Sequence, residues 1–193
     1  MSSINIDNEI RFRVVETTNL INDSNVFPVD KIKKLTIECL ATFEKKGKIA
    51  FVGNGGSAAE AMHLAAEFTG KCVVPHDPLP AICLNESQSA LTAIGNDYGF
   101  DKIFSRLVEA HLEQNDILIA LSTSGKSKNI VEAIESANKI GVKTYLWSGA
   151  TKTNLKLCDE FNAPSNSTPR IQEIHLIWGH ILSEILELHF TKR

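Results

Sequence analysis

Two short segments rich in glycine, serine and threonine carry the residue types that bind anions. They are Gly53-Asn54-Gly55-Gly56-Ser57 and Ser122-Thr123-Ser124-Gly125-Lys126-Ser127, and each follows an apolar run and precedes a helical pattern. A strand that ends in such a turn before a helix presents free backbone N–H groups and the positive end of the helix dipole. Both segments are therefore predicted to contribute to a phosphate-binding site.

Neither segment matches a nucleotide-binding motif in full. Gly53 and Gly55 fit a dinucleotide fingerprint, but the acidic residue expected about 20 residues later has no better candidate than Glu86. The second segment ends like a P-loop, yet Ala120 stands where the first glycine belongs. No nucleotide is expected. The hydroxyl cluster suits one phosphate monoester instead, while a purely structural turn and a simple helix cap remain alternatives.

Residues for acid–base or metal chemistry occur on two predicted helices. His63 and Glu67 lie four residues apart and project from one helix face, either as an exposed hydrogen-bonded pair or as half of a site. That half-site would supply metal ligands or a general base. On the last helix, Gln172 and His180 lie away from the apolar stripe, on a side that could also be an ordinary solvated face because Glu184 and Glu187 share it. The stripe comprises Ile171, Ile174, Ile177, Trp178, Ile181, Ile185 and Leu188, with His175 packed at its margin.

The pattern of apolar residues indicates the elements that must position these groups. Two leading helices are predicted at 4–21 and 29–43, and then short apolar runs alternate with helical segments. This alternation is typical of βαβ units, in which a parallel sheet carries helices on both faces. Strands are predicted near 48–52, 80–84, 116–122, 142–147 and 159–163, and further helices at 58–68, 87–112 with a turn at 95–99, 129–139 and 170–189.

Composition narrows the class of protein. A chain of 193 residues with 43% hydrophobic and 22% charged residues suits one globular domain, 1–193. A net charge of −3 gives no reason to expect nucleic acid as a partner. The four cysteines show no C-x-x-C pairing, and no apolar run approaches the roughly 20 residues that span a bilayer. We expect a cytoplasmic protein without a membrane partner.

Taken together, several segments resemble the phosphoheptose isomerases, the sedoheptulose 7-phosphate isomerase branch of the sugar isomerase (SIS) domain proteins. The resemblance covers about residues 48 to 189 in unbroken order. It is carried by the segments 53–57, 61–63, 67–70, 95–100, 103–106, 122–125 and 170–175, together with His180.

The resemblance implies an α/β fold, a three-layer sandwich whose central parallel sheet of about five strands is flanked by helices, plus N-terminal helices over 1–46 that pack on the domain or on partner subunits. It implies a homotetramer with sites at subunit interfaces. The implied reaction converts D-sedoheptulose 7-phosphate to D-glycero-D-manno-heptose 7-phosphate through an enediol, the first step of nucleotide-activated heptose synthesis.

The resemblance also implies roles for individual residues. Glu67 and His180 would be the catalytic pair, and zinc would bind His63, Glu67, Gln172 and His180. The phosphate would be held by Ser122, Thr123, Ser124 and Ser127, and the sugar by Asn54, Gly55, Gly56, Ser57, Glu67, Asn96, Asp97 and Gln172. Pro169, Ala58 and Ala59 depart from the family pattern. The alternatives are a non-catalytic SIS adaptor resembling the replication initiator-associating protein, and an isomerase for another ketose phosphate.

Overall fold

Five apolar runs form one parallel sheet in the computed structural model, which describes residues 4–153 and 155–191. The strand order is β2-β1-β3-β4-β5. Every residue of β1 and β3 is buried, as expected for strands covered on both faces. The strands are β1 Ile49–Gly53, β2 Ala81–Cys83, β3 Ile117–Leu121, β4 Lys143–Ser148 and β5 Asp159–Asn162.

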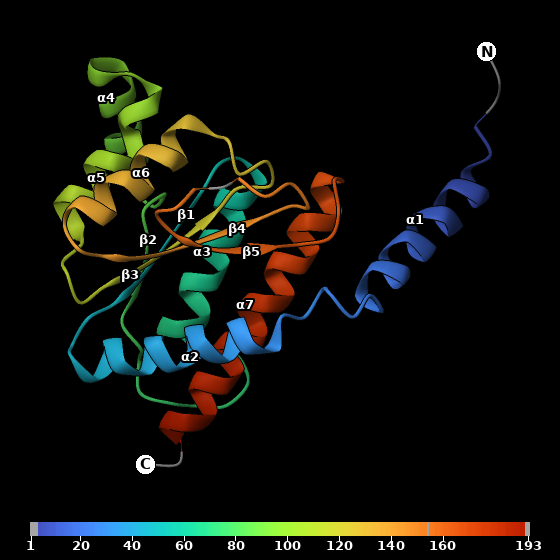
Figure 1. The fold of residues 1–193 in the computed structure, drawn as a ribbon, viewed down its shortest axis with the longest axis horizontal. Coiled ribbons are helices and arrows are strands. Elements are labelled where there is room, and N and C mark those ends of the chain that lie inside the picture. Colours follow the sequence, from blue (N-terminus) through green and yellow to red (C-terminus); the bar gives the residue numbers. More distant parts are fainter. Residues whose placement is uncertain (1–3, 154, 192–193) are drawn as a thin grey trace.

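Helices cover both faces of the sheet, so the chain has the three layers that the sequence predicts (Figure 1). One core lies between the sheet and α2, α3 and α7, and the other lies between the sheet and α5 and α6. The helices are α1 Ile6–Ile21, α2 Val29–Glu44, α3 Gly56–Thr69, α4 Gln88–Tyr98, α5 Ile103–His111, α6 Lys128–Lys139 and α7 Thr168–Thr191, with a 3-10 turn at Phe100–Lys102.

The strand order brings the two anion-binding segments together. From β1 the chain passes to β2 on one side and then returns to β3 on the other, so the topology switches between β1 and β3. Gly53 pairs with Leu121, and Leu121 pairs with Trp147, so these strands end at the same edge. In open parallel sheets, ligands bind beyond the carboxyl ends of the strands at such a switch point.

One predicted turn is misplaced. The sequence predicts a break over 95–99, but α4 continues through Tyr98. The helix ends at Gly99, whose φ of +90° is a conformation that only glycine adopts readily. The Asn96 side chain donates to the Asp97 carboxylate (2.8 Å) rather than competing for the backbone of its own helix.

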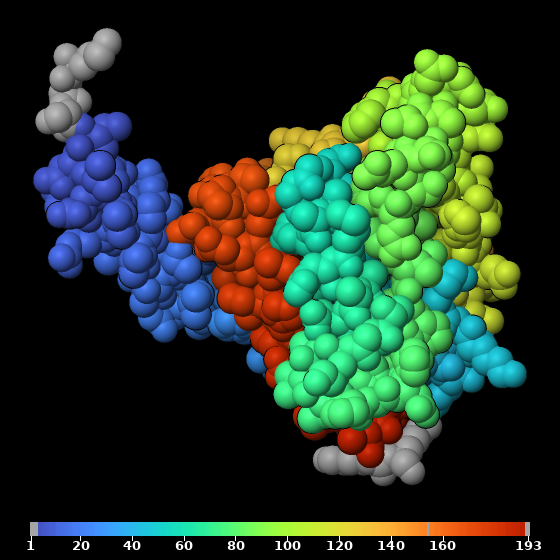
Figure 2. All heavy atoms as spheres, turned by 180° about the vertical axis from the view of Figure 1, so that it is seen from behind, coloured from blue at the N-terminus to red at the C-terminus, as the bar shows by residue number. Residues whose placement is uncertain are grey.

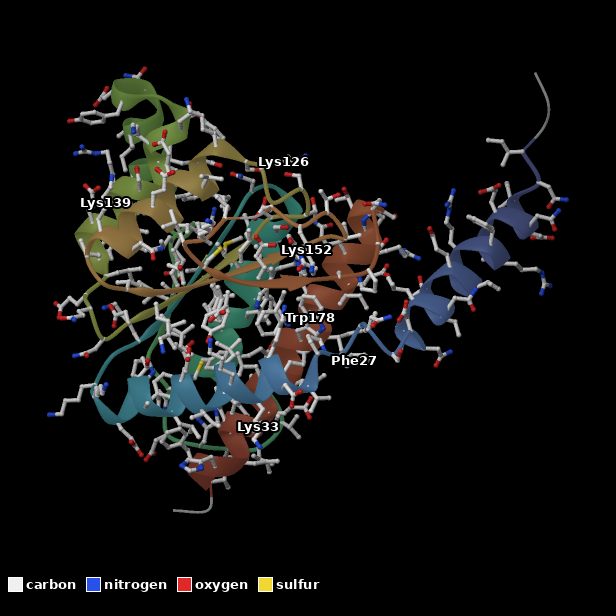
Figure 3. All side chains as sticks on the ribbon, in the orientation of Figure 1. Phe27, Lys33, Lys126, Lys139, Lys152 and Trp178 are labelled. Atoms are coloured by element: carbon white, nitrogen blue, oxygen red, sulfur yellow. The ribbon has the colours of Figure 1, made fainter. Side chains whose placement is uncertain are left out.

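The predicted apolar stripe of α7 also differs in part from the residues that the structure buries. Ile185 and Leu188 are 43% and 50% exposed, whereas Glu187, which the pattern placed on a solvated face, is only 1% exposed. The reason is tertiary contact: the Glu187 carboxylate accepts bonds from the backbone N–H groups of Cys72, Val73 and Val74 at 2.8 to 3.2 Å. His175 is fully buried, so its predicted packing is confirmed. Nearby, Trp178 donates its indole N–H to Val26 O (2.7 Å), where α7 passes the start of α2 (Figure 3).

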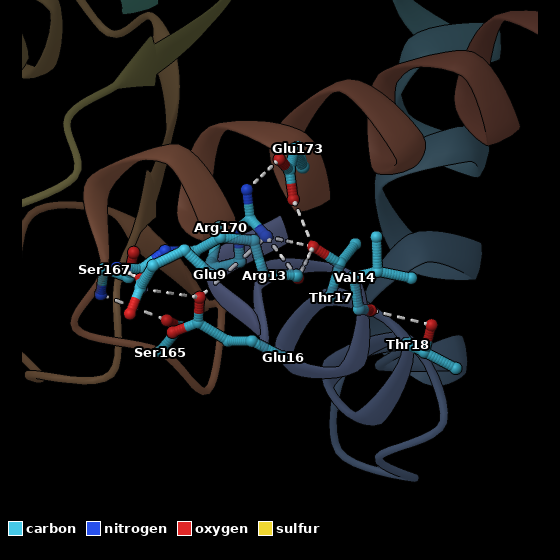
Figure 4. Close-up of polar contacts among 10 residues, drawn as sticks. All are labelled: Glu9, Arg13, Val14, Glu16, Thr17, Thr18, Ser165, Ser167, Arg170 and Glu173. Carbon is cyan, nitrogen blue, oxygen red and sulfur yellow. Dashed lines mark hydrogen bonds and ion pairs between the residues drawn. The ribbon is translucent and has the colours of Figure 1, made fainter. Parts of the chain in front are cut away.

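Helix α1 stands away from the rest of the molecule (Figure 2). None of its residues, all of which lie in the described part of the chain, is buried. Its polar contact with α7 centres on Arg170, which donates to Arg13 O (3.1 Å) and Thr17 and pairs with Glu173 (2.6 Å) (Figure 4), while Leu20 near its end packs against the core. Among the helices described, none is long and apolar enough to cross a membrane.

Candidate active site

The first loop depends on its glycines for its shape. A Cβ on Gly53 would lie 2.3 Å from the carbonyl oxygen of Ser57, and Gly55 has φ +56° at the start of α3. Glycine is needed where the backbone approaches this closely or turns this way. Asn54 then exchanges two hydrogen bonds with Asn129, at 2.8 and 2.9 Å. The structural role of the glycines is therefore real, and the loop is fixed against the start of α6.

The second loop does not cap the N-terminus of α6 with a side chain. Ser122 is buried and its N–H donates to Trp147 O (2.9 Å), while Gly125 has φ +64°. Ser127 is the N-cap of α6, but within the described chain its side chain makes no capping bond and instead meets the Ser122 hydroxyl at 3.5 Å. A simple serine cap thus does not account for this cluster. The first N–H groups of α6 remain suited to an anion.

A polar cavity of about 210 Å³ lies beside the second loop. Lys126, labelled in Figure 3, lines this cavity and adds a positive charge to the residues predicted to bind the phosphate. The position of Lys126 within the serine-rich loop is a sequence feature that could have assigned it to the site. Asn166, in the segment before α7, and Thr168, at the start of that helix, have no such feature. The lining residues are Thr123, Ser124, Lys126, Ala150, Thr151, Asn166, Thr168 and Ile171.

A second, mostly apolar cavity of about 400 Å³ opens on the first loop. Asn54 and Gly55 line it, and Gly95 lines it from α4. Asn96 and Asp97, the next two residues of α4, are exposed and bonded to each other. The remaining lining residues are Gly53, Asn85, Leu91, Thr92, Phe100, Ile103 and Phe104.

Three donors for acid–base or metal chemistry converge where α3 passes α7. Nε2 of His63 lies 2.9 Å from Nε2 of His180 and 3.4 Å from Oε1 of Glu67. The three ligand atoms lie within 4.8 Å of one another. The two helices approach closely here because Gly179 has no Cβ. A methyl group of Leu64 occupies that position, 2.2 Å from where a Cβ on Gly179 would lie. The half-site predicted on α3 and the residue predicted on α7 are thus brought together within one chain.

Gln172 lies away from His63, Glu67 and His180, near the start of α3. Its Nε2 lies 3.4 Å from the Ser57 hydroxyl and leaves no room for a side chain on Gly56. Gln172 lies eight positions before His180, about 12 Å along α7. Two imidazoles and one carboxylate are donors that zinc accepts, so His63, Glu67 and His180 fit a zinc ion. Gln172 as a fourth ligand stays a prediction.

The SIS domain family model matches residues 16–147 of the chain. A phosphoheptose isomerase from Helicobacter pylori (strain Shi470) is 46% identical over 156 residues, which cover 80% of this chain and 81% of the relative. One from Aliarcobacter butzleri is 42% identical, covering 89% and 90% respectively. The matched region includes both loops and α3.

Solved structures agree with the observed fold. The phosphoheptose isomerase from Neisseria gonorrhoeae superposes with a TM-score of 0.87 at 33% identity, covering 94% of this chain and 98% of the other. The phosphoheptose isomerase from Francisella tularensis gives 0.85 at 29% identity, covering 97% and 100%. The similarity therefore extends over nearly the whole length of each protein.

Proposed function

This chain belongs to the phosphoheptose isomerases of the SIS-domain family, and from that premise we propose that it converts D-sedoheptulose 7-phosphate to D-glycero-D-manno-heptose 7-phosphate. The observation that carries the proposal is the meeting of Glu67 and His180, residues from two helices far apart in the sequence, at one point. A carboxylate and an imidazole are the acid–base groups that this isomerisation needs.

In the proposed reaction Glu67 acts at carbon and His180 at oxygen. The Glu67 carboxylate removes a proton from C1 of the ketose, the C2 carbonyl electrons move to O2, and a 1,2-enediol forms as His180 protonates O2. His180 then removes the proton from O1, the C1 carbonyl forms, and Glu67 returns its proton to C2. Proton transfers at adjacent atoms are thus divided between a base that faces carbon and a group that faces oxygen.

We further propose that His63, Glu67 and His180 hold zinc, with Gln172 as the additional ligand that the family resemblance suggests. Bound zinc would polarise the substrate carbonyl and so favour loss of the neighbouring proton. The donor set supports this proposal, since two imidazole nitrogens and a carboxylate oxygen face a common point.

The substrate phosphate is assigned to the loop of Ser122, Thr123, Ser124 and Ser127, with Lys126 as an additional cation. The open end of α6 and the polar cavity beside it support this assignment. The first loop and Gln172 would contact the sugar. Asn96 and Asp97 would do so from α4, beside the cavity that the first loop lines.

A homotetramer with shared sites is part of the proposal. Ser57 is the last residue of the first loop, and Glu67 lies ten positions later, about 15 Å along α3. The phosphate on C7 and the reacting carbons C1 and C2 lie at opposite ends of the substrate, so a phosphate loop and a catalytic pair from different subunits could serve one molecule. The exposed α1 and an apolar groove of about 370 Å³ between α2 and α7 support association with further copies. We place the reaction in the cytoplasm, at the first step of nucleotide-activated heptose synthesis.

The test is a coupled assay of the full chain with sedoheptulose 7-phosphate in deuterated water. We expect turnover with incorporation of deuterium at carbon. Glu67→Gln should lower kcat by roughly 10²- to 10⁴-fold, the usual contribution of a general base, while it retains sugar-phosphate binding. Glu184→Gln, an exposed glutamate on α7, is the matched control. Turnover of Glu67→Gln at the wild-type rate would refute the mechanism.

The adaptor alternative is not favoured, because the relatives that match over most of the chain are named as isomerases. An isomerase for another ketose phosphate would retain the same catalytic pair. Parallel assays with shorter ketose phosphates distinguish it, since a preference for one of them would change the substrate without changing the mechanism.

A further inference from the structure

Glu60 is a buried carboxyl group that the proposed mechanism does not use. The residue is 5% exposed on α3, and neither of its carboxylate oxygens has a hydrogen-bond partner among the described residues that meets ordinary bond geometry. Burying a carboxyl group without partners is costly, and buried polar side chains are nearly always satisfied. Its position therefore calls for a specific role.

The packing of α3 on α7 locates this carboxyl group between two contacts of these helices. Gly56 meets Gln172, and Leu64 meets Gly179. Glu60 lies midway between Gly56 and Leu64, four positions from each, so it belongs to the same helix face. The face is covered by α7, so Glu60 has no direct access to a substrate in solution.

The polar group that acts on Glu60 is the Ser57 hydroxyl, one helical turn earlier. Burial raises the pKa of Glu60 to about 7, and the Ser57 hydroxyl opposes part of that rise by favouring the charged form. Ser57 is itself only 3% exposed, so its rotamer is set by protein groups rather than by bulk water.

Ser57 has a second partner that fixes the direction of its proton. The Gln172 side-chain amide donates to Ser57 Oγ at 3.4 Å. A hydroxyl that accepts from an amide still has one proton to donate. The carboxyl of Glu60, three residues later on the same helix and also buried, is an available acceptor for that proton.

We propose that Glu60 is a positioning residue: it receives the Ser57 hydroxyl proton and thereby orients both Ser57 and the Gln172 amide toward the sugar. The inference rests on the proposed function for the roles of Ser57 and Gln172. Glu60 touches neither the substrate nor the reacting atoms. Loss of its acceptor lets the Ser57 hydroxyl rotate and weakens the placement of the Gln172 amide.

The test compares Glu60→Leu, which removes the acceptor at similar size, with Glu60→Gln, which keeps a carbonyl acceptor. We expect Glu60→Leu to raise KM for sedoheptulose 7-phosphate by roughly three- to tenfold, the worth of one hydrogen bond, with a smaller change in kcat. Glu60→Gln should restore most of the wild-type KM. The double variant Glu60→Leu/Ser57→Ala should have a KM no higher than Ser57→Ala alone, because both act through one hydroxyl.

Thr144→Val is the matched control, since Thr144 is buried on β4 and its hydroxyl bonds to Leu157 O (2.7 Å) and the Asn138 amide (3.1 Å), which lie outside α3 and α7. A merely structural role for Glu60 would lower the active fraction, and so the apparent kcat, at unchanged KM; that result, or a Glu60→Gln no better than Glu60→Leu, overturns the inference. If Glu60→Leu does not fold, Glu60→Ala replaces it.

A readout without substrate separates this inference from the proposed function. The side-chain NH₂ resonances of Gln172 should shift in Glu60→Leu and stay at their wild-type positions in Thr144→Val. A shift in an enzyme that does not turn over sedoheptulose 7-phosphate would refute the proposed function alone. Unchanged Gln172 resonances in an active enzyme would refute the role of Glu60 alone.

Discussion

At the scale of single residues, the two roles proposed for Glu67 compete. A carboxylate bound tightly to zinc holds its lone pairs on the metal and becomes a weaker base toward carbon. Its Oε1 lies 3.4 Å from Nε2 of His63, and its side chain is 17% exposed. The imidazoles of His63 and His180, which face each other at 2.9 Å, could hold the metal while Glu67 keeps one oxygen for the proton.

His63→Ala tests the metal site apart from catalysis. Outer partners of metal ligands typically contribute 10- to 100-fold to affinity, so loss of a direct ligand should weaken zinc binding by roughly 100-fold or more. The measurement is competition between the purified protein and a chromogenic zinc chelator. His111→Ala, an exposed histidine at the end of α5, is the control and should bind zinc as the wild type does. Equal affinities for both variants would contradict the proposed zinc site.

Two buried groups in the core beside the site should make stability depend on pH in opposite directions. Burial lowers the pKa of His175 to about 4, against a smaller effect of its bond to Ser148 O. His175 is therefore protonated below about pH 6.5 in the unfolded chain but only below about pH 4 in the folded chain. Acidification across this range lowers the free energy of unfolding by on the order of 3 kcal/mol. The raised pKa of Glu60 acts oppositely: its contribution is present below about pH 4.5 and is lost as pH rises through about 7.

Glu60→Gln should therefore make the protein lose stability more steeply on acidification than the wild type does, because the effect of His175 is no longer opposed. The free energy of unfolding in urea, measured at pH 7 and pH 5 at one fixed protein concentration, checks this. His175→Phe should change the slope the other way. Parallel pH dependences in all three proteins would show that neither group titrates as its burial implies.

At the scale of elements, α7 serves as the common support of the site and of the loop after α3. Glu187 holds the loop 71–76 through three backbone N–H groups and a contact with His76 (3.3 Å). Burial alone would raise the pKa of Glu187, but the bonds from Val74, Val73 and Cys72 lower it overall. This loop leaves α3 just after Glu67, so its anchorage helps to fix the end of the helix that carries the proposed base.

Glu187→Gln should reduce the free energy of unfolding by roughly 2 to 3 kcal/mol, because an amide replaces a charged acceptor of several backbone bonds. Amide hydrogen exchange should accelerate in residues 71–76 in particular. Glu184→Gln, three residues earlier and exposed, should leave both quantities near their wild-type values. A uniform rise in exchange across the chain would argue against a local anchor.

The elements were largely predictable from sequence, because continuous apolar runs such as 117–121 have few alternatives to a buried strand. The strand order was not predictable, since no residue pattern indicates which strands pair with β1. The position of Glu187 was missed because its partners are backbone groups more than 110 residues away. Within the site, the i, i+4 pair of His63 and Glu67 and the shared helix of Gln172 and His180 could be predicted from sequence. The contact of Gln172 with Ser57 could not, because the two residues are 115 positions apart.

At the scale of the whole molecule, the surface of one chain carries exposed apolar area that the proposed homotetramer would cover. Val29 and Ile37 on α2 are 70% and 55% exposed, and with Ile185 on α7 they line the apolar groove. Helix α1 adds Ile10 and Val14, both 59% exposed. Apolar surface gathered in this way is typical of interfaces between subunits. Shared sites would make activity depend on that association.

If the proposed assembly forms through this groove, Ile37→Glu should abolish activity by dissociating it rather than by altering the chemistry. A carboxylate in an apolar interface loses its hydration without gaining a partner, which strongly disfavours association. Light scattering coupled to gel filtration should show a smaller species, and activity should fall in proportion to the assembled fraction as the protein is diluted. Leu157→Glu, an exposed apolar residue outside the groove, is the control and should leave both mass and activity unchanged. An Ile37→Glu protein that is monomeric and fully active would mean that each chain holds a complete site, and the phosphate loop and the catalytic pair would then have to serve one substrate across the length of α3.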